Sequence, residues 1–237
     1  MSVGIVFIIS AIIAESIGTF TGFGATTILL PIATFLMPLK TAIVLVSLFH
    51  FFGTTFRTIF FARKINLKIA LLFGIPSLIF SIIGASLLSS IDPIILTRLV
   101  GILLIIYAIY SLFKEKIVLP KSPALLVGGG SFVGFIAGLI GTAGAVRGAF
   151  LTSWNLSPEV YLGTGALMGL GADTARVGVY LKDGLLQFNA RLFLILALAA
   201  LTGTLIGRFL VKRTKANAFT KIVFLALVLA GARLLFS

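Results

Sequence analysis

Two glycine-rich interruptions decide the fold of this chain. Residues 18–25 read Gly-Thr-Phe-Thr-Gly-Phe-Gly-Ala, and residues 138–145 read Gly-Leu-Ile-Gly-Thr-Ala-Gly-Ala. Each interrupts a long apolar stretch, and the two fall at corresponding places in the two halves of the sequence. A duplicated membrane chain with a broken hydrophobic segment in each half is typical of secondary transporters, whose substrate sites lie at the breaks. The interruptions are therefore the first candidates for a substrate site.

The composition indicates a membrane protein. Of the 237 residues, 59% are hydrophobic and 11% are charged, and the mean hydropathy is +1.22. No soluble domain of this size needs so much apolar surface, and apolar runs long enough to cross a bilayer recur along the chain. We expect an all-α, multi-pass protein of the inner or plasma membrane, with the lipid bilayer as its surroundings.

The net charge of +13 reflects topology rather than nucleic-acid binding. The basic residues gather in short loops between apolar runs, where cytoplasmic Lys and Arg fix the orientation of the spans. The chain contains no cysteine, which excludes disulfides and thiolate metal sites. We expect no nucleic-acid partner, no metal and no cofactor.

The second half of the chain repeats the first. The stretch Gly53–Arg57 matches Gly171–Arg176, with one extra residue in the second stretch. We predict a first membrane repeat at residues 1–113, a polar inter-repeat loop at 114–123 and a second repeat at 124–237. Each repeat is expected to be a glycine-broken helix or a hairpin, followed by three transmembrane helices.

The relative direction of the repeats depends on residues 3–37, which at 1.5 Å per residue would extend about 52 Å against a hydrocarbon core of ~30 Å. One tilted, broken helix gives parallel repeats and divides the loop charges eight to six; a hairpin gives inverted repeats and divides them ten to four. The larger asymmetry agrees with the positive-inside rule, so we expect inverted repeats with both termini outside. The ten are Arg63, Lys64, Lys68, Lys114, Lys116, Lys121, Lys212, Arg213, Lys215 and Lys221, and the four are Lys40, Arg98, Lys182 and Arg191.

Few charged residues fall inside the predicted spans, where they are costly unless functional or paired. Arg57 and Arg176 occupy matching positions, so a pseudo-two-fold axis would bring two guanidiniums together, an arrangement suited to an oxyanion. Both also lie six residues before a basic position, Arg63 and Lys182, from which they could snorkel to the headgroups. Asp173 precedes Arg176 by three residues, a spacing that allows a local salt bridge.

Arg147 follows the second break, at the start of the next half-helix. Such a helix N-terminus carries unpaired N–H groups and partial positive charge, which favour an anion. The matching position in the first repeat is Thr27, next to Thr26. Glycines let the backbone approach a ligand, although small residues also serve plain helix packing. The predicted substrate-binding residues are Gly22, Gly24, Thr26, Thr27, Arg57, Gly141, Gly144, Arg147 and Arg176.

Three further residues are candidates for coupling transport to an ion gradient. Glu15, before the first break, is either a proton-coupling carboxylate or the partner of a basic group. His50 lies near the middle of its apolar run and could titrate during a transport cycle, although a lone histidine in a helix bundle is more often a hydrogen-bonding residue. Asp173 is the third candidate.

The motifs resemble those of the sulfite exporter TauE/SafE family. The first break followed by Leu29-Leu30-Pro31, the helix through Gly53–Arg57 and the turn Arg63-Lys64-Ile65-Asn66 resemble its first repeat, and residues 134–144 resemble its second glycine-rich motif. The resemblance extends over essentially the whole chain. It implies a compact duplicated permease that moves sulfite, thiosulfate, sulfoacetate or related organosulfonates, often outward. The second break departs from the pattern, because Phe150-Leu151 stands where a proline is common.

We therefore expect a secondary transporter of a small sulfur-containing anion, working by alternating access with the anion bound at the two breaks. The alternatives are a channel, or a subunit for another small anion or an organic acid. An enzyme is disfavoured, because one histidine, no cysteine and two membrane carboxylates supply little acid–base or metal chemistry. The expected partners are the anion and the bilayer, and homo-oligomer formation stays open.

Overall fold

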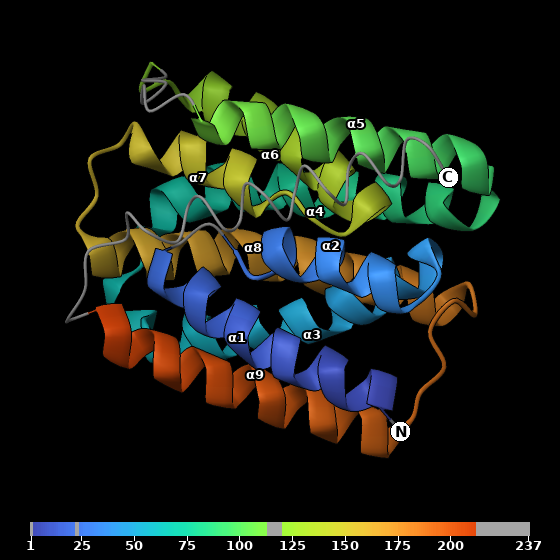
Figure 1. The fold of residues 1–237 in the computed structure, drawn as a ribbon. Helices are drawn as coiled ribbons and strands as arrows, with labels where there is room; N and C mark the ends of the chain where they lie inside the picture. Colours follow the sequence, from blue (N-terminus) through green and yellow to red (C-terminus); the bar gives the residue numbers. More distant parts are fainter. Residues whose placement is uncertain (1, 22–23, 113–119, 212–237) are drawn as a thin grey trace.

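A computed structural model describes every residue except 1, 22–23, 113–119 and 212–237, and the described residues form helices joined by short loops (Figure 1). The all-α prediction is therefore confirmed for this part of the chain. Gly22 and the predicted loop residues Lys114, Lys116, Lys212, Arg213, Lys215 and Lys221 lie outside it. The elements are α1 (Ser2–Thr21), α2 (Thr26–Leu36), α3 (Leu39–Phe60), the 3₁₀ turn η1 (Ala62–Lys64), α4 (Leu67–Ser90), α5 (Pro93–Leu112), α6 (Pro123–Ile140), α7 (Gly144–Thr152), α8 (Pro158–Lys182) and α9 (Ala190–Val211).

Four of the described helices, α3, α4, α6 and α9, are long and apolar enough to cross a membrane. Shorter apolar stretches cover Gly4–Phe20 of α1 and Pro93–Ile106 of α5. On α4, the outward-facing Ile75, Ile79 and Ile83 are exposed. Exposed isoleucines at this spacing form a lipid-facing stripe, because a helix satisfies its own backbone in the bilayer and can present apolar side chains to the acyl chains.

Local chemistry explains where several helices begin and end. Gly141 ends α6 with a left-handed φ of +77°, which glycine adopts without a Cβ penalty. Pro123 and Pro158 stand in the first turns of α6 and α8, where the missing N–H breaks no helical hydrogen bond. The side chain of Asn66 accepts a hydrogen bond from the Ile69 N–H and caps α4.

The chain turns back on itself at the first break. Helix α2 packs against α1, and Figure 1 shows it returning beside α1 toward the end where the chain begins. Gly18 permits the reversal, because a Cβ there would overlap the backbone nitrogen of Ala25. Helix α7 likewise packs against α6. With 11 and nine residues, α2 and α7 reach about 16 and 14 Å, roughly half of the hydrocarbon core.

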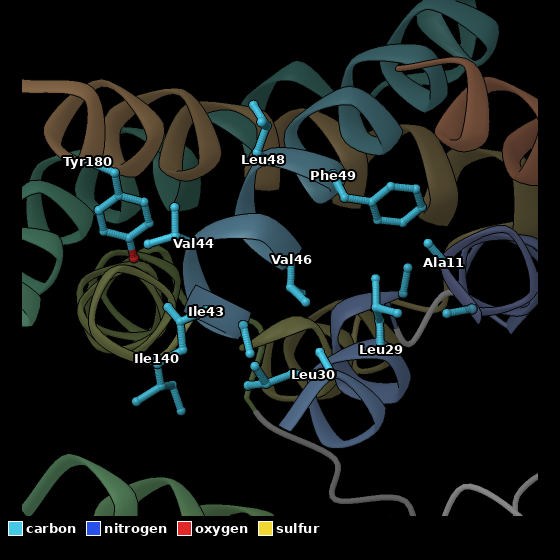
Figure 2. Packing of buried hydrophobic residues seen from close by; sticks show 14 of the residues in the cluster. Ala11, Leu29, Leu30, Ile43, Val44, Val46, Leu48, Phe49, Ile140 and Tyr180 are labelled. Carbon is cyan, nitrogen blue, oxygen red and sulfur yellow. The ribbon is translucent and has the colours of Figure 1, made fainter. Parts of the chain in front are cut away.

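The largest apolar core surrounds α3. In Figure 2, Leu29 and Leu30 of α2 point into the same interior as Val46 of α3, with Phe49 directed toward Ala11 of α1. All five side chains are fully buried. The core thus holds the first hairpin against the middle of the bundle.

Glycines allow close backbone contact in two helix pairs, α4 with α6 and α1 with α9. Three glycines spaced four residues apart on α6 place its backbone directly against that of α4, which is the small-xxx-small pattern of membrane helix packing. A Cβ on any of these three glycines would overlap a carbonyl oxygen of α4. The α6 glycines are Gly130, Gly134 and Gly138, facing Phe73, Ser77 and Ser81; on α9, Gly203 and Gly207 face Ile12 and Ser16 of α1.

The helix contacts occur in matching pairs. Let α1 correspond to α6, α2 to α7, α3 to α8 and α4 to α9. Exchanging each helix for its counterpart then converts the α1–α9 contact into the α4–α6 contact. It also converts α3–α9 into α4–α8, α1–α2 into α6–α7, and α2–α3 into α7–α8. The α3–α8 and α2–α7 contacts map onto themselves.

We predict opposite effects for two alanine substitutions on α6. Gly134→Ala should lower the free energy of unfolding by about 1–3 kcal/mol, the usual result of overpacking, because its Cβ would meet the Ser77 carbonyl. Gly128→Ala should keep or raise stability, since nothing lies within 4 Å of its Cβ and alanine favours a helix by about 0.5–1 kcal/mol. Thermal unfolding in detergent measures both, and equal shifts would contradict the proposed close contact of α4 and α6.

Candidate functional site

Five ionisable side chains from α1, α3 and α8 are buried together inside the apolar bundle. Glu15, His50, Arg57, Asp173 and Arg176 are each at most 4% exposed. The sequence analysis singled out all five, and the structure brings them into one cluster. Because Arg57 and Arg176 are buried, neither reaches the headgroups by snorkelling.

The five side chains form a continuous row of contacts. Arg57 Nη1 lies 3.4 Å from Glu15 Oε1, and Arg57 Nη2 lies 3.3 Å from His50 Nε2. On the other side of the ring, His50 Nδ1 lies 2.8 Å from Asp173 Oδ2. Asp173 Oδ1 in turn lies 2.7 Å from Arg176 Nη2, the local salt bridge expected from the spacing of these two residues. Each guanidinium therefore has its own carboxylate.

His50 joins the two ion pairs. Its two closest contacts assign the neutral tautomer with the proton on Nδ1, because Nδ1–H then donates to the Asp173 carboxylate while Nε2 accepts from Arg57. The alternative tautomer would place a lone pair against the carboxylate and an N–H against the guanidinium. His50 thus acts as a bridging hydrogen-bonding residue in this structure.

Further hydrogen bonds tie the cluster to the surrounding helices. Thr54 Oγ1 donates to Asp173 Oδ2 at 2.8 Å. Arg176 Nη1 donates to the Ala137 carbonyl on α6 at 3.0 Å. Glu15 Oε1 accepts from Thr19 at 3.1 Å and from Thr204 on α9 at 3.0 Å. The row therefore connects five helices.

Arg147 on α7 lies beside the row without a carboxylate of its own. Among the described residues it forms no ion pair within 4 Å. Its guanidinium lies against Gly169, where a Cβ would overlap it. A Cβ on Gly24 would stand 4.0 Å from its Nη2 and 3.9 Å from His50 Nε2. With His50 neutral, three guanidiniums and two carboxylates leave one positive charge in this region.

The two glycine breaks meet next to this charge. Thr26 Oγ1 donates to Thr142 Oγ1 at 3.0 Å, which links the start of α2 to the loop before α7. Gly24 has a left-handed φ of +89°, and a Cβ there would lie 3.3 Å from the Gly144 Cα. Thr27 is buried at the same junction. The tips of both hairpins are therefore in direct contact.

A small cavity opens beside the hairpin tips. Its volume is about 20 Å³, which is room for about one water molecule. Arg57 and Arg147 both line it. The complete lining is Gly18, Gly24, Arg57, Arg147, Gly148, Leu151, Tyr161, Leu162, Gly165 and Ala166. A larger hollow of about 360 Å³ lies elsewhere, among Phe60, Arg63, Lys64, Glu159 and Arg208 at the ends of α3 and α9, and takes no part in the buried row.

The predicted substrate-binding residues divide between these places. Gly24, Arg57 and Arg147 line the cavity. Thr26, Thr27 and Gly144 lie at the contact of the two breaks, and Gly141 ends α6 just before it. Arg176 is instead held by Asp173 and Ala137 beyond His50.

Sequence reasoning missed several residues of the site. The sequence points only weakly to Thr54 as a site residue. It lies one helical turn after His50 and so shares the same helix face. Thr142 belongs to the second break but resembles a loop residue. Gly165 cannot be distinguished from a packing glycine in the sequence, and nothing in the sequence points to Tyr161. Their role depends on how α7 and α8 meet in space.

Comparison with known proteins identifies one family. A family model described as Sulfite exporter TauE/SafE matches residues 7–234, which is nearly the full chain. No curated protein and no solved structure matches.

Removing a charge from the buried row should destabilise the fold strongly. We predict that Asp173→Asn lowers the free energy of unfolding by about 3–5 kcal/mol, the usual cost of breaking a buried ion pair, because it leaves Arg176 without its carboxylate. Lys64→Ala removes the exposed pair with Glu159, which contributes at most ~1 kcal/mol. Thermal unfolding of the two variants checks the difference, and comparable losses would contradict the structural importance of the row.

Proposed function

Because the chain belongs to the sulfite exporter TauE/SafE family, a family of membrane transporters, we propose that it is a secondary carrier of a small sulfur-containing oxyanion such as sulfite, thiosulfate or an organosulfonate. The family and the four apolar spanning helices make it a multi-pass membrane protein. One observation carries the proposed binding site. Arg147, which has no carboxylate partner among the described residues, faces a cavity at the point where the two helix breaks meet.

The groups around the cavity suit an oxyanion. Arg147 and Arg57 present guanidinium donors to the same space, and a guanidinium binds planar or tetrahedral oxyanions through paired hydrogen bonds. The Nε of Arg57 is buried and has no hydrogen-bond partner. The first turn of α7, from Gly144 onward, adds N–H groups and partial positive charge. A single negative charge in the cavity would neutralise the region.

The size of the cavity supports alternating access. A space that admits about one water is too small for a sulfur oxyanion, so the hairpin tips must separate for the anion to bind. The Thr26–Thr142 hydrogen bond and the Gly24–Gly144 contact hold the hairpin tips together beside the cavity. Broken helices whose half-helix ends meet near mid-membrane form the substrate sites of many secondary transporters.

The same proposal includes two inverted repeats, residues 1–113 and 124–237, joined by the loop 114–123. The matching pairs of helix contacts support it, because they are what a pseudo-two-fold relation between the halves would produce. The directions in Figure 1 also favour it, since α1 and α6 run in opposite directions along the bundle. An axis passing between α3 and α8 would place both breaks at the same depth.

The proposed function predicts selective anion binding and counterflow. In detergent, sulfite, thiosulfate or sulfoacetate should raise the melting temperature, while sulfate, acetate, taurine and chloride serve as comparison ligands. A ligand at a hundred times its Kd stabilises the folded state by about 2.7 kcal/mol. In proteoliposomes, unlabelled anion inside should drive uptake of labelled anion, which a carrier supports and a channel does not. If no sulfur anion raises the melting temperature more than the comparison ligands do, the proposed sulfur-anion substrate is wrong. Anion flux without counterflow would favour a channel.

We predict that Arg147→Ala weakens binding of the stabilising anion by about 10–100-fold, because charge-assisted hydrogen bonds contribute roughly 1.5–3 kcal/mol. The same variant should keep or gain stability without anion, since it removes a partly buried charge that forms no ion pair with the described residues. Arg63→Ala, an exposed arginine in η1, is the matched control and should bind normally. Isothermal titration and thermal unfolding check both properties, and an Arg147→Ala variant with unchanged affinity would remove Arg147 from the site.

A further inference from the structure

The two buried carboxylates of the row are held very differently. Asp173 uses both oxygens, since Oδ1 meets Arg176 at 2.7 Å and Oδ2 meets His50 and Thr54 at 2.8 Å each. Glu15 uses only one. Its Oε1 receives Thr19, Thr204 and a more distant Arg57 at 3.4 Å, whereas its Oε2 is fully buried without a hydrogen-bond partner. Glu15 is therefore the carboxylate with a free buried oxygen.

The helices around Glu15 pack closely against that oxygen. A Cβ on Gly53 would lie 2.6 Å from Oε2, so the glycine provides the space beside it. Helix α3 presents Arg57, and α9 presents the neutral Thr204 and Gly203. Asp173 on α8 acts on Glu15 as a like charge. The residues of α2 include no titratable side chain. Among the described residues, Arg57 is thus the one cation within 4 Å of this carboxylate.

Arg57 belongs to two sites at once. It compensates Glu15 through Nη1, and it also lines the cavity proposed for the anion. Its Nε has no partner, and its contacts with Glu15 and His50 are long, at 3.4 and 3.3 Å. An anion in the cavity competes with Glu15 for the same guanidinium. If Arg57 turns to the anion, Glu15 is left as a buried carboxylate without a cation, which is strongly unfavourable.

We propose that Glu15 is the binding site of a coupling proton, which it takes up when the anion draws Arg57 away. This inference rests on the anion site of the proposed function. The proton comes from water and binds Oε2, while Oε1 keeps its hydrogen bonds from Thr19 and Thr204. The charges balance, because the region carries one excess positive charge before binding. A divalent anion alone would turn this into one negative charge, and one proton on Glu15 restores neutrality.

Glu15 differs from the other titratable members of the row in being able to receive a proton when an anion binds. His50 has both ring nitrogens in hydrogen bonds, and Asp173 has both oxygens in use. Neither has to give up a cation when an anion binds Arg57 and Arg147. Only Glu15 both loses its counter-charge and has an unoccupied oxygen to receive a proton.

The experiment counts protons taken up on binding by the purified full-length protein. Thiosulfate is the probe, because it remains a dianion near neutral pH. Isothermal titration in buffers with different ionisation enthalpies should give about one proton per bound thiosulfate for the wild type. The affinity for thiosulfate should then fall by up to about tenfold for each unit by which the pH rises, as linkage requires for one proton taken up on binding. Glu15→Gln should bind thiosulfate with about zero protons, whereas Glu159→Gln, a matched change at an exposed glutamate, should behave like the wild type.

A spectroscopic measurement on the wild type covers the case in which Glu15→Gln does not fold. Infrared difference spectra on adding thiosulfate should show a new protonated carboxylic acid band. The band should shift when glutamate, and not aspartate, carries ¹³C, and it should persist in Glu159→Gln. Binding without proton uptake, or a band that follows the aspartate label, would overturn the inference and leave the carrier intact. Absence of binding by every anion of the panel would instead overturn the proposed function itself.

Discussion

The requirement to compensate charge inside an apolar bundle governs this structure. Glu15, His50, Arg57, Asp173 and Arg176 are buried where water cannot solvate them, so each must find its partner within the fold. Their contacts run from α1 through α3 to α8 and extend to α6 and α9. These polar contacts specify which helices are neighbours in a way that apolar packing alone does not, since apolar surfaces fit many arrangements. The cavity, with its one unmatched guanidinium, is a consequence of that arrangement.

The parts of this architecture that could be predicted from sequence are the local ones. The glycine interruptions located both helix breaks, and the three-residue spacing of Asp173 and Arg176 indicated their salt bridge. The ambiguity over residues 3–37 was real, because a broken helix and a hairpin share one hydropathy pattern. What separates them is the close approach at Gly18 and Ala25, which depends on the absence of a side chain and leaves little trace in composition.

The non-local contacts could not be predicted. His50 and Asp173 are 123 residues apart, and no periodicity in a single sequence relates them. Symmetry was also an incomplete guide. Arg57 and Arg176 are equivalent by sequence, yet Arg57 meets a carboxylate on α1 and lines the cavity, while Arg176 is held by its own helix and by a carbonyl of α6. The two arginines therefore have different surroundings although their positions in the sequence correspond.

The two helix pairs joined through glycines limit how the molecule can move. Helix α1, from the first half of the chain, packs closely against α9, from the second half, and α6 packs in the same way against α4. The two halves are therefore held together at two places. Neither can rotate as a rigid body without separating these backbone contacts. The short arms α2 and α7 lie outside both pairs. If the chain is the carrier proposed above, α2 and α7 are the helices that can shift while the two close helix pairs stay packed.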